Sequence, residues 1–470
     1  MPGDFVVLKF GGTSVASAGH WRTIADIVSK RRKEGHRVLL VCSALAGVTD
    51  RLEALADAPP GEPGAILDAL EARHHEHAAA LGVDGPALVE AGIGGIRRAA
   101  DRYTDTCDPA DRAELLAWGE WLSAALGHAY LSRSMAAGLV DAREALTVLD
   151  ENGAHPRRAW LSARCAAGPD NELLGRWSEL DPVLVTQGFV ARAADGRTAL
   201  LGRGGSDTSA ALLAGRLRAD RCEIWTDVPG LFSADPRHLP GARLVESLDF
   251  TEALEMAAGG ARVVHPRCLH AAAEAGIPVE IRDTTRPGLP GTRIVPREGA
   301  APEGIKAIAM QPGMAVLLLE NRDIRQQVGF LAGVFADVAA QGVSVDSVAT
   351  SETTTTLAIH RQANLLDDPA LLALEQRLAQ RCAVTVFPDA AALHVVGRGA
   401  RRALAQLGGL AGWLDGHRLL MVSQSANDCC LSLLVPGEAA AELLGQLHAA
   451  LIEPRDEGFG RRWRDIGDDS

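Results

Sequence analysis

The 470-residue sequence is poor in aromatic residues and has no long apolar run. Aromatic residues make up 4% of the chain, which argues against the stacking surfaces that bind single-stranded nucleic acid. The formal net charge of −13 argues further against a nucleic-acid partner and against an anionic membrane surface. No apolar stretch approaches the ~20 residues that span a bilayer, and no basic leader precedes the first strand, so we expect neither secretion nor a membrane partner.

The eight cysteines show no Cys-x-x-Cys spacing, and the adjacent Cys429 and Cys430 cannot easily bridge each other. Neither a zinc ribbon nor a disulfide framework is therefore indicated. Reduced thiols are typical of cytosolic proteins, so we expect a cytoplasmic location.

Lysine is scarce as well, because only four of the 47 basic residues are lysines. One of them, Lys9, ends an apolar strand at 5–10 that runs into the turn Gly11-Gly12. Paired glycines let backbone N–H groups come close to an anion, and Ser17 is placed to cap the following helix. The stretch predicts a phosphate-holding loop, although an ordinary glycine turn beside a snorkelling lysine would have the same sequence.

The first part of the chain, residues 1–295, alternates apolar strands with amphipathic helices, which predicts an α/β domain with a largely parallel sheet between helices. The expected elements are strands at 5–10, 37–43, 183–191 and 222–226, a helix at 18–33, a loop at 58–64 and a mostly helical layer at 65–140. Proline and glycine crowd residues 286–303, as in a linker.

The pattern changes after this linker to two similar small α+β units of the split βαβ type, followed by a charged tail at 456–470. The unit at 305–385 is expected to contain strands at 305–310 and 315–319, a helix at 330–341, strands at 343–349 and 354–360, a helix at 369–381 and a strand at 383–387. The unit at 386–455 is expected to contain a strand at 392–396, a helix at 399–406, strands at 417–422 and 428–435 and a helix at 437–450.

Three glycines surround Arg203 in the segment 201–210, which enters an alanine-rich helix. They free the backbone for close ligand approach, and Ser206 or Asp207 is a candidate N-cap. A guanidinium beside a helix N-terminus suits a carboxylate or phosphate, although a tight capped turn is the simpler interpretation.

Two further segments carry polar residues at positions where a ligand could bind. Residues 225–237 follow a strand at the edge where open α/β sheets bind ligands, so they are candidates to frame a nucleotide, although ordinary turns have similar sequences. Glu120 lies in an apolar helical stretch, and a buried carboxylate there needs a partner such as a substrate ammonium, whereas an exposed one needs none.

Taken in order, these motifs resemble the aspartate kinase (aspartokinase) family of the amino acid kinase superfamily, with tandem C-terminal ACT domains. The matching segments are 9–14, 43–49, Gly119-Glu120, 186–189, 202–207, 225–237 and the two C-terminal units. The resemblance implies an amino acid kinase fold followed by two ferredoxin-like ACT domains. It also implies ATP-dependent phosphorylation of the side-chain carboxylate of L-aspartate to 4-phospho-L-aspartate, the first step of lysine, threonine and methionine (diaminopimelate) biosynthesis.

The family pattern implies a role for each matching side chain. Lys9 would contact the transferring phosphoryl group, and Arg203 would grip the substrate α-carboxylate. Glu120 and Asp207 would receive the ammonium, and Asp207 would also be catalytic and organise Mg²⁺. The positions that would complete the amino-acid pocket are Thr49, Phe189 and Ser206.

The ATP-binding positions that the resemblance implies are Lys9, Phe10, Gly11, Gly12, Thr226, Asp227, Phe232, Arg237 and Arg262. Two of them depart from the family pattern. Phe232 stands where many relatives have tyrosine, and Arg262 where many have lysine, so a nucleotide contact is weaker than usual if these positions bind it.

ACT domains of this family usually bind an end-product amino acid, often within a homodimer. Ser344, Val345 and Asp346 match the position where relatives bind lysine, so we expect lysine as the inhibitor, threonine as the second choice and loss of feedback as the third. The preceding loop at 325–329 departs from relatives.

Two other interpretations stay open: a catalytically inactive amino-acid-sensing ACT protein, and a kinase of another small amino acid. The first is disfavoured by the presence of Lys9, Glu120, Arg203 and Asp207. An N-acetylated acceptor is disfavoured because it has no cation for the carboxylates. The chain has no room for a second fused enzyme, although it could be a piece of one.

Overall fold

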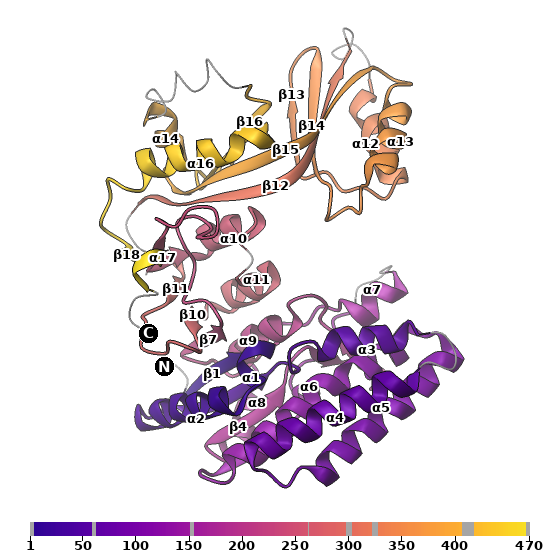
Figure 1. Cartoon of the computed structure of the whole chain (residues 1–470), viewed down its shortest axis with the longest axis vertical. Helices are drawn as coiled ribbons and strands as arrows, with labels where there is room; N and C mark the ends of the chain where they lie inside the picture. The colour runs from indigo at the N-terminus through magenta and orange to yellow at the C-terminus, as the bar shows by residue number, and fades with distance from the viewer. Residues whose placement is uncertain are drawn as a thin grey trace. The chain divides into compact units, whose positions relative to one another are not determined.

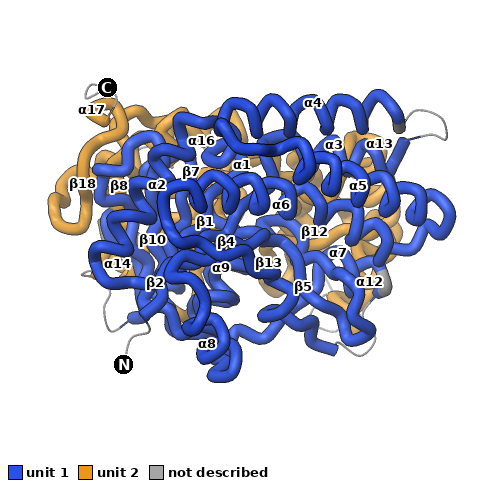
Figure 2. The backbone as a smooth tube through the Cα atoms, turned by 90° about the horizontal axis from the view of Figure 1, so that it is seen from below, with its two compact units in different colours: residues 1–231, 246–250, 262–300 blue, residues 232–245, 251–261, 301–470 orange. Residues whose placement is uncertain are grey.

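The computed structural model describes residues 4–58, 63–150, 155–261, 263–297, 303–321, 328–406 and 418–466. The chain forms two compact units (Figure 2). The first comprises residues 1–231, 246–250 and 262–300, and the second comprises residues 232–245, 251–261 and 301–470. Residues 232–245 and 251–261 of the predicted domain 1–295 therefore pack within the second unit. The predicted domain limits stay predictions.

The first unit is built on an eight-stranded sheet (Figure 1). Its strands, in spatial order, are β3 (Ala137–Leu139), β4 (Val183–Gln187), β2 (Arg37–Cys42), β1 (Phe5–Phe10), β7 (Arg221–Thr226), β10 (Val279–Asp283), β11 (Thr292–Val295) and β9 (Ser247–Asp249). Only the β10–β11 pair is antiparallel, which confirms the largely parallel sheet. β1 is buried along its whole length, as a strand covered on both faces requires. β11 lies within the linker predicted at 286–303, so the linker prediction is wrong for residues 292–295.

The helices of this unit include the predicted N-terminal helix and helical layer. They are α1 (Gly12–Val15), α2 (Ala18–Lys33), α3 (Val48–Ala56), α4 (Pro63–Leu81), α5 (Pro86–Thr106), α6 (Pro109–Leu131), α7 (Pro156–Leu161), α8 (Asn171–Ser178), α9 (Gly205–Arg216) and α11 (Pro266–Ala275), while α10 (Phe250–Ala258) enters the second unit. The Ser17 side chain caps α2 by accepting the His20 N–H, as predicted.

The helical layer is packed closely because glycines face large side chains. Helices α4, α5 and α6 lie side by side in Figure 1. A Cβ on Gly92 of α5 would lie 2.2 Å from Leu122 of α6, and one on Gly95 would lie 2.4 Å from Trp118. The two helices therefore approach at a distance that only glycine permits.

The predicted strand at 183–191 is interrupted. β4 ends at Gln187, and β5 (Val190–Arg192) turns away to pair with β6 (Thr198–Leu200) in a separate hairpin. The reason is local: Phe189 has φ +68°, which no strand residue adopts.

The second unit contains a six-stranded sheet in the order β13-β14-β12-β15-β17-β16. Its elements are β12 (Gly304–Glu320), α12 (Phe330–Ala340), β13 (Ser347–Thr350), β14 (Thr354–His360), α13 (Asp368–Leu378), β15 (Ala383–Arg398), α14 (Ala400–Gln406), β16 (Met421–Gln424), β17 (Cys430–Pro436) and α16 (Gly437–Leu451). The strands predicted at 305–310 and 315–319 form one strand, and so do those predicted at 383–387 and 392–396. A register shift between Gln311 and Met314 lies where the strands predicted at 305–310 and 315–319 were separated.

The two long strands contribute to both halves of this sheet. Residues 314–320 pair with β14 and residues 316–320 also pair with 383–387, which gives the β-α-β-β-α-β order of a ferredoxin-like unit, as expected for an ACT domain. Residues 304–311 pair instead with 392–398, so the strand predicted at 305–310 as part of the first unit pairs with a strand of the second. Part of the predicted tail is β18 (Phe459–Arg462), which pairs with β8 (Arg243–Val245), followed by α17 (Trp463–Ile466). No helix in the described ranges has the length and apolar character needed to cross a membrane.

Candidate active site

The predicted phosphate loop lies where parallel strands of the first unit end. Hydrogen bonds join the residue that follows one strand to the end of the neighbouring strand: the Gly11 N–H donates to the Trp225 carbonyl of β7 at 3.1 Å, and the Ser43 N–H donates to the Phe10 carbonyl of β1 at 3.2 Å. The carboxyl ends of β1, β2 and β7 thus meet at one edge, where open α/β sheets bind ligands.

The glycine turn is packed against the next loop. A Cβ on Gly12 would lie 2.7 Å from the Ala44 carbonyl oxygen, so a larger residue there would displace backbone. The Ala46 N–H donates to the Gly12 carbonyl at 3.2 Å, and this loop leads through Gly47 into α3, whose first turn holds Thr49. The Phe10 ring is fully buried in a stack with Trp225, so only the backbone of Phe10 remains for a ligand.

Lys9 is paired with Asp207. The Lys9 Nζ lies 2.5 Å from Asp207 Oδ1, and only 8% of Lys9 is exposed. Burial alone would lower the pKa of the Lys9 ammonium, but the Asp207 carboxylate, assisted by Glu120, outweighs it and holds the pKa above its ordinary value. The lysine therefore stays a cation at neutral pH, inside a site where charge is poorly screened.

The N-terminus of α9 supplies Ser206 and Asp207, but neither residue caps it, which corrects the sequence prediction. Gly204, in the left-handed conformation at φ +65°, is the N-cap. Both side chains are consequently free to reach across the site, Asp207 to Lys9 and Ser206 to Glu120.

Glu120 of α6 is buried, which decides between the two interpretations of its position. It is 5% exposed, and the Ser206 hydroxyl donates a hydrogen bond to its Oε1. Its Oε2 lies beside Gly188, whose backbone N–H helps to stabilise the carboxylate, and accepts no hydrogen bond from a side chain among the described residues. Burial raises the pKa of Glu120 to about 7, although Ser206 and Lys9 oppose this shift. A buried carboxylate with a free oxygen can accept a ligand cation.

Phe189 adopts a strained conformation beside this cluster. Its φ of +68° is rare for a residue with a large side chain, and its N–H donates to Ser209 Oγ of α9 at 2.7 Å. A Cβ on Gly205 would lie 2.3 Å from the Phe189 ring, so the ring packs directly on the first turn of α9. Such strain persists only where surrounding contacts fix it, and it clusters at functional sites.

Arg203 lies in the turn between β6 and α9. It is exposed and makes no hydrogen bond or ion pair with any residue that the structure describes. Gly202 and Gly204 on either side have φ values of +75° and +65°. Its guanidinium is therefore available to an oxyanion that enters the site.

The sequence analysis missed His265 and Arg267, which contact this turn. A Cβ on Gly204 would lie 2.3 Å from the His265 Cβ, and Arg267 donates to the Leu201 carbonyl. In the sequence these residues show only the pattern of a helix start, with His265 as N-cap and proline at the first helical position. This pattern does not reveal which residues their side chains contact.

The predicted nucleotide segment is divided between the two units. Thr226 is the last residue of β7 and Asp227 follows it, and the Thr226 hydroxyl donates to Asp227 Oδ1 at 3.1 Å. Phe232 and Arg237 belong to the second unit, where Phe232 packs edge-on against Trp463 and Arg237 pairs with Asp235 at 2.6 Å. Arg262 lies outside the described residues. The nucleotide roles of all five residues stay predictions.

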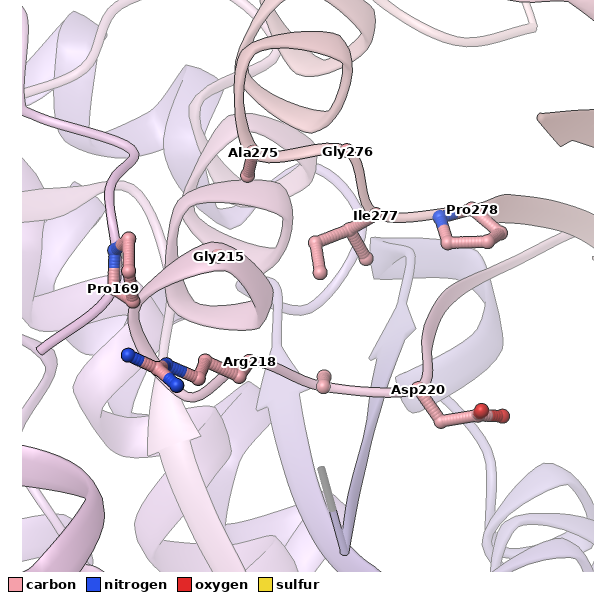
Figure 3. A pocket seen from close by; sticks show the side chains of 9 residues that line it. Pro169, Gly215, Arg218, Asp220, Ala275, Gly276, Ile277 and Pro278 are labelled. Carbon is pink, nitrogen blue, oxygen red and sulfur yellow. The ribbon is translucent and has the colours of Figure 1, made fainter. Parts of the chain in front are cut away.

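A surface pocket of about 300 Å³ lies elsewhere on the first unit (Figure 3). Its lining includes Arg218 and Asp220, which precede β7, and Ile277 and Pro278, which precede β10. Figure 3 shows the side chains of Arg218 and Asp220 pointing in different directions. The pocket lies at the amino ends of these strands, opposite the edge that holds Lys9, and is therefore separate from the candidate site.

Comparison with known proteins identifies the family of the chain. The model of the amino acid kinase family matches residues 4–283. Lysine-sensitive aspartokinase 3 of Escherichia coli is 34% identical over 459 residues, which cover 96% of this chain and 100% of that protein. The chain belongs to the aspartokinase family. Two solved structures of Escherichia coli aspartokinase III are each 33% identical and cover 96% of this chain and 100% of theirs.

The two structures of Escherichia coli aspartokinase III differ in their ligands. One holds lysine and aspartate and superposes with a TM-score of 0.78, and the other holds aspartate and ADP and superposes with a TM-score of 0.76. An aspartate kinase from Clostridium acetobutylicum, 20% identical with a TM-score of 0.76, shares the fold. The recognition of the aspartokinase family and of its fold is thus confirmed.

The predicted allosteric residues lie between α12 and β13 in the second unit. Ser344 and Asp346 are exposed, and the Ser344 N–H donates to Asn364 Oδ1 at 2.6 Å. Asp346 Oδ2 accepts the His360 N–H at 2.7 Å, and Val345 packs against the apolar core of this half. Residues 325–327 of the preceding loop lie outside the described residues.

Proposed function

We propose that this aspartokinase transfers the γ-phosphoryl group of ATP to the side-chain carboxylate of L-aspartate. A carboxylate oxygen attacks phosphorus, the bond to the β-phosphate oxygen breaks, and the products are 4-phospho-L-aspartate and ADP. The observation that carries the proposal is the cluster of Lys9, Asp207, Ser206 and Glu120 at the carboxyl ends of the parallel strands. The Escherichia coli relative with aspartate and ADP bound supports it.

The phosphoryl-transfer end of the site is built from Lys9 and the glycine turn. Charge on the equatorial oxygens of the transferring group is stabilised by a preorganised cation in a site poor in water. Lys9 is such a cation, because Asp207 keeps it protonated and fixes its head group. The acceptor is already a nucleophilic carboxylate, so no protein base or nucleophile is needed.

The acceptor end is built from Glu120 and Arg203. The ammonium of aspartate would lie against Glu120, whose Oε2 accepts no hydrogen bond from another side chain among the described residues. Arg203 would bind the α-carboxylate, and Thr49, Phe189 and Ser206 would complete the pocket. The two charged ends of the amino acid are thereby fixed while the side-chain carboxylate points toward Lys9.

Asp207 is the residue that fits a magnesium ion. Its Oδ1 is engaged by the Lys9 ammonium, whereas its Oδ2 makes no hydrogen bond among the described residues and would be the oxygen available to the ion. No group of three or more His, Cys, Asp and Glu side chains in the described ranges forms a metal site. Mg²⁺ commonly takes one carboxylate together with phosphate oxygens and waters, so Asp207 would be the protein group that holds an ion bound with ATP. The ion neutralises phosphate charge when bound.

The deciding assay measures ADP release from ATP and Mg²⁺ with different acceptors. We expect turnover with L-aspartate and little with N-acetyl-L-aspartate, which has no ammonium for Glu120. L-Glutamate, one methylene longer, tests the alternative of another small amino acid. Absence of turnover with every amino acid, in protein that binds lysine, would favour the inactive sensor instead.

We further propose that lysine inhibits this aspartokinase through Ser344, Val345 and Asp346, in a homodimer joined by its ACT domains. Asp346→Asn removes the charge that would pair with the lysine ammonium but keeps an oxygen for the His360 N–H. We expect the lysine concentration for half-inhibition to rise about tenfold or more, with uninhibited turnover unchanged.

This regulatory prediction is checked by titrating activity with lysine and, separately, with threonine. Glu375→Gln is the matched control, because it removes one carboxylate from α13 of the same half without a described contact. Inhibition by threonine alone would reassign the effector, and unchanged lysine sensitivity in the Asp346 variant would exclude this site. Sedimentation of the wild-type chain tests the dimer.

A further inference from the structure

Arg267 connects three separate segments around the turn that carries Arg203. It is the second residue of α11, and its own N–H donates to Nδ1 of the capping His265 at 3.2 Å. Its Nη1 donates to the Leu201 carbonyl and, at 3.1 Å, to Ser162 Oγ, while Nη2 donates to the Ala163 carbonyl at 2.5 Å. One guanidinium thus holds the start of the turn against the segment 162–163.

The turn depends on such outside contacts because of its glycines. Gly202 and Gly204 are left-handed, and glycine by itself restricts the backbone least. The peptide groups of Leu201 are held on both sides, since its N–H donates to the Phe189 carbonyl at 2.9 Å and its carbonyl accepts from Arg267. A Cβ on Gly202 would lie 2.8 Å from Ser162 Oγ, so the turn is pressed against this support.

The same contacts reach the strained pocket residue. The Phe189 carbonyl accepts from Leu201, and the Phe189 N–H donates to Ser209 of α9. Arg267, Leu201, Phe189 and α9 therefore form one continuous hydrogen-bonded chain. The Arg203 side chain, by contrast, makes no hydrogen bond or ion pair with a described residue, so it is positioned through the backbone that carries it.

We propose that Arg267 is a positioning residue for the amino-acid acceptor. By fixing the Leu201 carbonyl it holds the Gly202–Gly204 turn, and through it Arg203 and the first turn of α9, in the geometry that binds the α-carboxylate and ammonium. This inference rests on the proposed function and adds to it a residue that lies outside the acceptor pocket. It predicts damage to acceptor binding rather than to nucleotide binding.

The kinetic test compares Arg267→Ala with the wild-type enzyme. We expect the aspartate KM to rise about tenfold or more, with the ATP KM within about twofold, because the loss falls on the acceptor side. Added guanidinium ion, below denaturing concentration, is expected to restore part of the affinity for aspartate. Arg216→Gln is the matched control: it removes an arginine that contacts Asp170 and Gly168 at the far end of the same α9, and should leave both constants unchanged.

A second measurement separates this inference from the proposed function. Hydrogen exchange of the substrate-free protein should quicken at residues 201–209 and 188–191 in Arg267→Ala but not in Arg216→Gln. Unchanged exchange there overturns the proposal even if the wild-type chain phosphorylates nothing. In an active wild-type enzyme, an unchanged aspartate KM in Arg267→Ala, or an equal rise in both KM values, also overturns it.

Discussion

Replacing Lys9 by methionine should reduce the rate of phosphoryl transfer by about 10³-fold or more. Methionine has nearly the length of lysine but cannot spread the charge of the transferring group. The loss should appear in kcat, because the missing interaction is strongest in the transition state. Steady-state ADP release at saturating ATP and aspartate measures it.

Lys9→Met also leaves Asp207 without its cation in a partly buried place, so folding must be verified by circular dichroism and thermal unfolding. Lys30→Met is the matched control, since Lys30 is an exposed lysine in the last turn of α2. A folded Lys9→Met enzyme that retains turnover within about tenfold of wild type would exclude Lys9 from phosphoryl transfer.

Replacing Glu120 by glutamine should raise the aspartate KM by about 100-fold, with a much smaller change in the ATP KM. Glutamine keeps the shape and can still accept the Ser206 hydrogen bond, but it cannot balance an ammonium that loses its water on binding. Glu90→Gln, an exposed glutamate of α5 without a described contact, is the control. Equal changes in both KM values would refute the assignment of Glu120 to the substrate ammonium.

The same residue predicts a pH dependence. Because burial raises the pKa of Glu120 to about 7, protonation should remove the ammonium partner as the pH falls. The kcat/KM for aspartate should therefore decline below about pH 7 in the wild-type enzyme, and the decline should be absent from Glu120→Gln. A profile that is flat from about pH 8 to 5.5 in wild type would contradict a pKa near 7.

The free energy of unfolding should depend on pH in the opposite sense to kcat/KM. The pKa of Glu120 is higher in the folded than in the unfolded chain, so the stability it contributes is complete below about pH 4.5 and is lost as the pH rises through about 7. Glutamine mimics the neutral form, so Glu120→Gln should be more stable than wild type by up to roughly 3 kcal/mol at about pH 8, and nearly equal to it at about pH 4. Thermal unfolding without substrate at both pH values measures the difference; a variant that is less stable at about pH 8 would contradict it.

Local sequence patterns predicted much of the chemistry but not its connections. Lys9 with its glycine turn and the capped helix at 18–33 could be read from neighbouring residues, because strand burial and capping act over a few positions. The expectation that Ser206 or Asp207 caps α9 was wrong, because a side chain at a helix start that reaches another element looks the same in sequence as one that caps its own helix.

Other positions were left open or misread because local sequence does not show what a residue contacts in the fold. Glu120 could have been exposed or buried, because α6 is covered on nearly all sides and its apolar pattern marks no surface stripe. The left-handed Phe189 was read as strand, since nothing in a run of apolar residues reveals a positive φ. Arg267 was missed because its partners Leu201 and Ala163 lie 66 and 104 positions away along the chain.

The sequence by itself determined the fold family, the parallel sheet and the kinds of charged group available to a phosphorylated acceptor, because these follow from periodicity, composition and ordered motifs. Only the tertiary structure decided which of those charges meet: Lys9 with Asp207, Ser206 with Glu120, and Arg267 with the turn of Arg203. The physical reason is that ion pairing, burial and pKa shifts depend on distances across the folded sheet, which separation along the chain does not specify.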